Sequence, residues 1–174
     1  MESRFPGFPC LKQGADRYAM NRWAGRGFSG FDYHYETYSH DKHGRHTHHH
    51  YFSAVVVPSP IPLKPLFLRP EGLMDKVTEF FGYDDIDLES AEFSRKFYVK
   101  SPDRRWAFDV LHARTMAFLL ARPSFHLQLE GGHGMAWHTG TLSPQEFEAA
   151  IEVLSGIFEG LPEYVVRQQK GVAP

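Results

Sequence analysis

Histidine is concentrated in one short part of this sequence. Seven of the eleven histidines in the 174-residue chain lie between Phe28 and Val57. They are His34, His40, His43, His46, His48, His49 and His50. Neutral imidazole is a common ligand of Zn²⁺, Cu²⁺ and Ni²⁺, so these residue types raise transition-metal binding as one chemistry for the region. Whether several of them can meet on one ion depends on the backbone that carries them.

Alternating residue types predict a β-hairpin across this region. On the first arm, one face carries Phe31, Tyr33, Tyr35 and Thr37, and the other carries Asp32, His34, Glu36 and Tyr38. The second arm, 48–57, ends in a β-branched run that suits a strand with neighbours on both sides. Between the arms, 39–47 is polar throughout with one glycine, which is typical of an exposed hairpin loop.

The register of this hairpin decides whether a metal site can form. If opposed residue numbers sum to an even value near 86, one face of the hairpin carries His34, Glu36, His48 and His50. Neighbouring side chains on that face would be close enough to converge on one Zn²⁺, Cu²⁺ or Ni²⁺ ion. A slip of one residue would bring in His49 and Tyr51 instead and dissolve this site. The alternative interpretation is a polar hairpin tip that is simply rich in histidine.

The metal hypothesis makes predictions that distinguish a defined metal site from non-specific metal binding by a histidine-rich surface. A formed site should hold one ion per chain and lose it when His34 alone is replaced, whereas His40 and His43 should be dispensable. Because metal binding requires neutral imidazole, affinity should also fall as the pH drops through about 6.5.

Composition predicts one globular domain. We expect an irregular amino-terminal arm over 1–16, a single domain over 17–166 and a frayed tail over 167–174. The formal charge of −2 does not suggest nucleic acid or an acidic membrane surface as partner, and the single cysteine, Cys10, leaves no internal disulfide. No run approaches the ~20 apolar residues of a membrane span. The chain as written is therefore expected to be cytoplasmic, or membrane-associated if its true start lies upstream.

The order of predicted elements indicates an α+β fold, with an antiparallel sheet and helices packed mainly on one face. Short strands are expected at 17–23 and 93–99, and a second hairpin at 124–138 turning at Gly131 and Gly132. Helices are expected over 71–81, from Ser101 to about Ala121 with a break near His112, and after Ser143, where Glu146 completes a capping box. Proline at alternate positions 58–62 predicts a sheet edge or a boundary. The predicted core comprises Phe31, Tyr33, Val55, Val77, Phe80, Phe97, Trp106, Leu119, Leu127, Ile151 and Leu154.

No other motif carries a strong chemical signal. The remaining histidines are interpreted as surface or hydrogen-bonded residues, namely His112, His126, His133 and His138. The acidic run 84–89, the glycine-rich turn 131–134 and the Arg104–Arg105 pair lack the patterns of a calcium loop, a phosphate loop or a basic patch. No nucleophile arrangement can be picked out. The leading interpretation is therefore a non-catalytic interaction or assembly module that binds a protein partner or a second copy, using its proline-rich edge and aromatic arm.

Several phrases together resemble an uncharacterised family of bacterial domains. They are Phe31-Asp32-Tyr33, the segments 66–72 and 87–95, and the capped helix that follows Ser143. The resemblance covers about 17–166. It implies a soluble domain that in related proteins follows one or two amino-terminal membrane helices, and it supplies no catalytic residues. This chain departs from that pattern because it carries no such helix.

Overall fold

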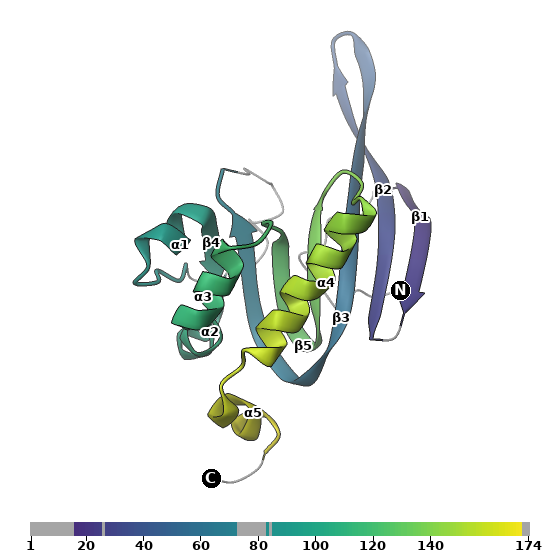
Figure 1. The fold of residues 1–174 in the computed structure, drawn as a ribbon. Helices are drawn as coiled ribbons and strands as arrows, with labels where there is room; N and C mark the ends of the chain where they lie inside the picture. Colours follow the sequence, from purple (N-terminus) through teal and green to yellow (C-terminus); the bar gives the residue numbers. More distant parts are fainter. Residues whose placement is uncertain (1–15, 26, 73–82, 84, 172–174) are drawn as a thin grey trace.

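The computed structural model describes residues 16–25, 27–72, 83 and 85–171. These residues form an antiparallel sheet with five helices, which confirms the predicted α+β class (Figure 1). The strands are β1 (Asp16–Gly25), β2 (Phe28–Asp41), β3 (Gly44–Pro70), β4 (Phe97–Lys100) and β5 (His126–Thr139). The helices are α1 (Ala91–Lys96), α2 (Arg104–Val110), α3 (Ala113–Leu120), α4 (Pro144–Glu159) and α5 (Glu163–Gln169). None of these helices is long and apolar enough to cross a membrane.

Strand β3 organises the sheet because all the other strands except β1 pair with it. Its first part pairs with β2, its last four residues pair with β4, and β5 follows it along most of its length. Figure 1 shows β3 curving around β5.

Strand β5 reverses direction within its own length. The evidence is that the rings of His126 and Trp137 stack with centroids 3.9 Å apart. Eleven residues of straight strand would separate them by roughly 36 Å. The predicted reversal at Gly131 and Gly132 is confirmed, and both halves of β5 lie against β3.

The prolines of β3 occupy a stretch that has a neighbour on one side only. β2 pairs with β3 as far as Val56, and β4 begins to pair at Phe67, so among the described residues no strand covers that side at 58–62. On the other side, the register with β5 shifts between Pro58 and Leu66. Because proline cannot donate to a ladder, it fits this interrupted stretch. The predicted sheet edge is confirmed for one side of the strand.

The predicted strand at 93–99 is wrong over its first four residues, which belong to α1. Ser90 begins that helix, because its side chain accepts a hydrogen bond from the Phe93 amide, and β4 starts only at Phe97. The local cap outweighs the aromatic strand pattern. The helix predicted over 71–81 lies almost wholly outside the described residues.

The run predicted from Ser101 to about Ala121 forms two short helices, α2 and α3, and the predicted break near His112 is confirmed. The helix α2 is capped by the Asp103 side chain, which accepts from the Trp106 amide, so the predicted start at Ser101 is wrong and the helix begins at Arg104. Ser101 instead donates to the carbonyl of Pro65. The last helix, α5, runs two residues beyond Arg167, where the frayed tail was expected to begin.

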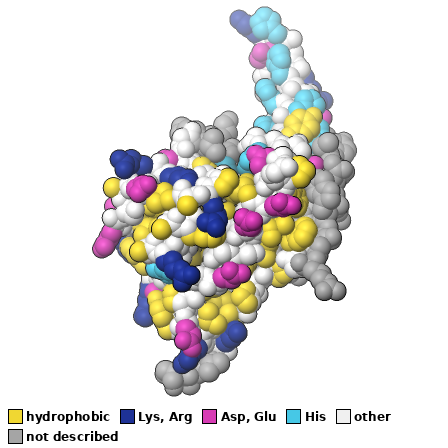
Figure 2. Space-filling view, viewed as in Figure 1, with side chains coloured by type: hydrophobic (Ala, Val, Ile, Leu, Met, Phe, Trp, Pro, Cys, Tyr) yellow, Lys and Arg dark blue, Asp and Glu magenta, His cyan; other side chains and the backbone are white. Residues whose placement is uncertain are grey.

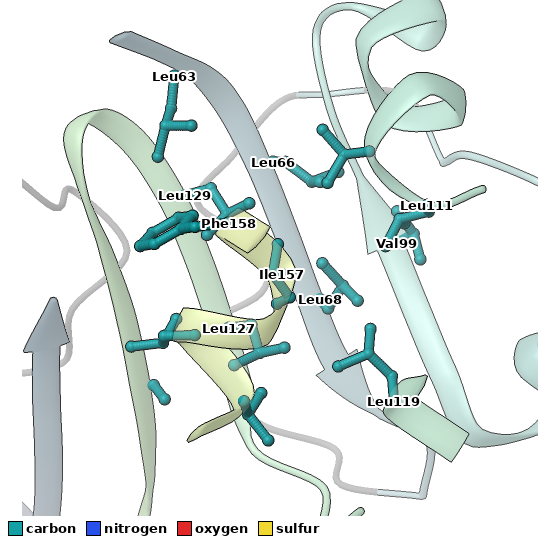
Figure 3. Packing of buried hydrophobic residues seen from close by; sticks show 14 of the residues in the cluster. Leu63, Leu66, Leu68, Val99, Leu111, Leu119, Leu127, Leu129, Ile157 and Phe158 are labelled. Carbon is teal, nitrogen blue, oxygen red and sulfur yellow. The ribbon is translucent and has the colours of Figure 1, made fainter. Parts of the chain in front are cut away.

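The main core lies between α4 and the sheet. Ser143 and Glu146 form the predicted capping box, which fixes the start of α4. Figure 3 shows Ile157 and Phe158 of α4 facing Leu127 and Leu129 of β5. Of the predicted core, the buried residues are Val55, Phe97, Trp106, Leu119, Leu127 and Leu154; Phe31, Tyr33 and Ile151 are half-buried; Val77 and Phe80 lie outside the described residues.

A fully buried serine ties β2, β3 and the loop before α4 together. The Ser53 hydroxyl donates to a carboxylate oxygen of Asp32, which is itself buried, and accepts a 3.0 Å hydrogen bond from the Leu142 amide. A polar group that loses its partner in the interior costs about 1–3 kcal/mol. Loss of this hydroxyl would therefore remove a hydrogen bond from both the Asp32 carboxylate and the Leu142 amide.

Replacing Ser53 by alanine is expected to lower the free energy of unfolding by about 1–3 kcal/mol. Urea denaturation measures this loss. Ser39→Ala is the matched control, because the Ser39 hydroxyl also makes a hydrogen bond, at 2.9 Å to His48, but is exposed. Water can replace that partner, so the control should change stability by at most about 0.5 kcal/mol. Equal losses in the two variants would contradict the structural role of Ser53.

Candidate functional site

The outer parts of β2 and β3 form an arm that extends away from the rest of the fold. We define the projecting hairpin as residues 37–48, which lie beyond the last described pairing of β2 with β1, at Glu36, and of β3 with β5, at Phe52. Figure 1 shows this arm rising above the sheet, and Figure 2 shows histidine side chains gathered along it. Residues 38–49 are all exposed. The arm therefore contributes little to the core of its own domain.

The turn of the hairpin is tighter than the sequence suggested. Asp41 pairs with Gly44, so only Lys42 and His43 lie in the loop, and the strands extend through most of the predicted loop at 39–47. Gly44 has a φ of +125°, a conformation that other residues rarely adopt, and the His43 amide donates to Asp41 at 2.7 Å. This two-residue turn fixes how the two arms are aligned.

The register is one residue away from the predicted one. Opposed residue numbers sum to 85 along the whole hairpin, from the pair Ser29 and Val56 to the pair Asp41 and Gly44. The expected even sum near 86 is therefore wrong, because a two-residue loop between paired residues requires an odd sum. Side chains alternate between faces, so this shift transfers His48 and His50 to the face opposite His34 and Glu36.

His49 takes the place that the sequence analysis gave to His48 and His50. The Nε2 of His34 lies 3.1 Å from the Nδ1 of His49, and that Nδ1 lies 3.1 Å from the Oε1 of Glu36. The third distance, from His34 Nε2 to Glu36 Oε1, is 4.0 Å. These three side chains offer two imidazole nitrogens and one carboxylate oxygen to a common point. Such a donor set suits a transition-metal ion better than Mg²⁺ or Ca²⁺.

Neighbouring groups hold this set in position. The Tyr38 hydroxyl donates to the other carboxylate oxygen of Glu36 at 2.9 Å, which leaves Oε1 directed at the imidazoles. The His34 ring stacks on Tyr51 with centroids 4.4 Å apart and planes 10° apart. We define the histidine–glutamate cluster as His34, Glu36 and His49.

His48 and His50 make separate contacts on the opposite face. The Nε2 of His50 lies 2.9 Å from the hydroxyl of Thr37, and the Nε2 of His48 lies 2.9 Å from the hydroxyl of Ser39. The predicted four-residue set is thus divided into two pairs. The signal that could have found His49 is the sequence Asp41-Lys42-His43-Gly44, because a glycine closing a two-residue loop specifies an odd register.

Histidines elsewhere in the fold have structural contacts. The Nε2 of His112 lies 2.9 Å from the Gly160 carbonyl, which links the start of α3 to the end of α4. His138 lies 3.6 Å from a carboxylate oxygen of Glu146, and His126 is buried against Trp137. These contacts agree with the predicted hydrogen-bonded role for His112 and correct the surface alternative for His126, which is 1% exposed.

Comparison with known proteins places the fold but not the activity. No family model matches the sequence, and no curated protein matches it. The bacterial family suggested by the sequence phrases therefore stays a prediction. Among solved structures, the chain is similar to the crystal structure of the mycobacterial trehalose monomycolate transport factor A, TtfA. The match has a TM-score of 0.52 and 11% identity and covers 88% of this chain and 92% of that chain, so it supports a shared α+β fold and carries no function across.

Proposed function

We propose that this domain is a non-catalytic interaction module that captures an extended segment of a partner protein along the projecting hairpin. The observation that supports it is a backbone edge of β3 that no strand covers within the described part of the chain. The proposal keeps the interaction role expected from the sequence. It moves the docking surface from the proline-rich edge and the aromatic amino-terminal arm, of which residues 1–15 lie outside the described residues, to the projecting hairpin.

The edge opens where β5 leaves β3. Their last pair is Phe52 with Thr139, after which the Gly140 amide donates to the Tyr51 carbonyl at 2.8 Å and the chain turns toward α4. In an antiparallel strand, alternate residues direct their N–H and C=O groups to the same side. Arg45, Thr47 and His49 therefore direct theirs to the side that β5 occupies at Tyr51. An extended peptide can add a strand to such an edge.

The side chains of the arm supply contact area as well. Tyr38 is 37% exposed and Tyr51 is 45% exposed, and the Arg45 guanidinium lies 3.7 Å from the centre of the Tyr38 ring. Tyrosine and arginine are enriched at protein interfaces, because each presents an apolar body together with hydrogen-bonding groups. A partner strand on β3 would meet this surface next to its backbone contacts.

The cost of ordering the arm also favours a partner. Fixing a residue's backbone costs about 1–2 kcal/mol, and a two-stranded hairpin on its own is marginally stable. Burial within the domain offsets little of this cost, because residues 38–49 are exposed. Burial against a partner would offset more of it.

Replacing Thr47 by proline is expected to abolish partner capture without unfolding the domain. Proline removes one N–H that points to the open edge, while the bonds between β2 and β3 involve the alternate residues. A photo-activated cross-linker at Tyr38, introduced into the chain in its native host, measures capture. Hydrogen exchange on the captured complex should show protection of the Arg45, Thr47 and His49 amides.

Thr47→Val is the matched control, because it keeps the N–H and the strand preference and should retain the cross-links. Equal cross-linking of the proline and valine variants would refute edge recognition. Cross-links only between copies of this chain, with a dimer in light scattering, would refute a heterologous partner and identify self-assembly instead.

A further inference from the structure

We propose that His34, Glu36 and His49 bind one divalent transition-metal ion at the base of the projecting hairpin. The ligand atoms are His34 Nε2, Glu36 Oε1 and His49 Nδ1, and a fourth position is left to water or an exogenous ligand. This site uses the side chain of His49, whereas the interaction proposal uses the backbone of the same residue on the open edge of β3. It also differs in membership from the set that the sequence pattern suggested.

The three ligand atoms have the spacing that a small ion requires. Separations of 3.1, 3.1 and 4.0 Å define a triangle, and the circle through its corners has a radius of about 2.0 Å. Zinc lies about 2.0–2.1 Å from imidazole nitrogen and 2.0–2.2 Å from carboxylate oxygen in proteins. An ion at or just off the plane of the triangle would therefore reach all three atoms with these side chains where they are.

Hydrogen bonding alone satisfies this arrangement poorly. The Nδ1 of His49 lies 3.1 Å from both His34 Nε2 and Glu36 Oε1. A ring nitrogen carries at most one proton, and an ionised carboxylate oxygen only accepts. If His49 gives its one proton to Glu36, it has no lone pair left to accept a bond from His34. A cation at the centre would engage all three lone pairs at once.

The surroundings restrict the movement of two ligands and leave the third accessible. The His34 and Glu36 side chains are 14% and 21% exposed, whereas His49 is 50% exposed. The contacts of Tyr38 with Glu36 and of Tyr51 with His34 orient these two ligands in the way that outer groups support known metal sites. An ion would enter from the His49 side, where the open coordination position also faces solvent.

Titration of tag-free protein with Zn²⁺ tests the site. The protein is purified without metal-affinity resin, stripped with chelator and titrated calorimetrically, with Co²⁺ absorption as a second readout of the ligand field. We expect one Zn²⁺ ion per chain to bind more tightly than any further ions. Mutation of a residue that only supports a metal ligand typically weakens metal binding by roughly 10–100-fold. Because His49 is itself a ligand in this proposal, His49→Ala should weaken Zn²⁺ binding by at least that factor.

The hairpin provides a closely matched control one residue away. His48 is also an exposed histidine, but it faces the opposite side and bonds Ser39. His48→Ala should therefore keep the native stoichiometry and affinity. Equal weakening in the two variants, or several weak ions per chain with no dominant site, would overturn the proposal in favour of a histidine-rich adhesive surface. Unfolding curves without metal check that both variants fold.

The metal test and the interaction test can fail separately. Thr47→Pro should still bind Zn²⁺ like the native chain, because its side chain is not part of the histidine–glutamate cluster. His49→Ala retains the backbone edge, so its partner cross-links report on the interaction without the metal ligand. Loss of one property with retention of the other identifies which proposal is wrong.

Discussion

Replacing Leu154 by alanine is expected to lower the free energy of unfolding by about 2–5 kcal/mol. Leu154 is fully buried in the middle of α4, within the main core. Its Cδ2 lies 3.0 Å from the position that a β-carbon on Gly134 would occupy, so helix and sheet are in close contact here. Truncation removes the Cγ methine and both Cδ methyl groups and leaves a cavity that this closely packed contact cannot fill.

Glu152→Ala serves as the control, because it lies on the exposed side of the same helix. Both variants introduce alanine, so the helix preference of the new residue is the same. The control should change stability by no more than about 0.5 kcal/mol, as measured by urea denaturation. Similar losses in both variants would mean that α4 does not pack on the sheet through Leu154.

Features that depend on local pattern could be predicted from the sequence. The capping box of Ser143 and Glu146 and the first hairpin follow from residue types a few positions apart. The face assignment on the first arm also holds: Phe31 and Tyr33 pack against a buried cluster, and Asp32 lies on the other face with Ser53. Alternation within one strand fixes these faces without reference to a partner strand.

Features that depend on how two segments align could not be predicted in the same way. Predicting the candidate site required the register between β2 and β3, because one residue more or fewer in the turn changes which histidines share a face. His34 and Glu36 were identified because they lie two residues apart on one strand. His49 was assigned to the wrong face because the loop was expected to be longer than Lys42 and His43.

Competition between local signals explains the remaining differences. Residues 93–96 have strand-like aromatic spacing, but the cap from Ser90 makes them helical. In α4, Val153 and Ile157 are buried, whereas Ile151, which was predicted to lie in the core, is half-buried. Which side of α4 is buried depends on its packing against the sheet, and the spacing within α4 does not by itself determine that packing.

His126 gives the fold a built-in sensitivity to acid. It is 1% exposed, and its ring stacks on Trp137 with centroids 3.9 Å apart. Burial, helped by the positive charge of Arg69, lowers the pKa of His126 to about 4. An exposed histidine has a pKa of about 6.5. The folded protein therefore holds this imidazole neutral at pH values where the unfolded chain protonates it.

The sign of the effect follows from proton binding. Between pH 6.5 and 4 the unfolded chain binds a proton at His126 that the folded chain does not, so stability falls as the pH falls through this window. A pKa lowered to about 4 corresponds to a loss of about 3 kcal/mol once the pH has dropped to that value. Above pH 6.5 both states are neutral at this residue, and His126 contributes no pH dependence.

Replacing His126 by phenylalanine is expected to remove this component, because phenylalanine keeps an aromatic ring against Trp137 but cannot take up a proton. The measurement is the difference in unfolding free energy between the native chain and His126→Phe, by urea denaturation from pH 7.5 to 4.5. Whatever the variant's stability at pH 7.5, the difference should shift in its favour by about 2–3 kcal/mol at the acid end. In the native chain, the His126 ring protons should show no titration by NMR above about pH 5. If the difference in unfolding free energy stayed constant across the pH range, His126 would take up its proton as readily in the folded state as in the unfolded chain. Burial of this imidazole would then not cause acid sensitivity.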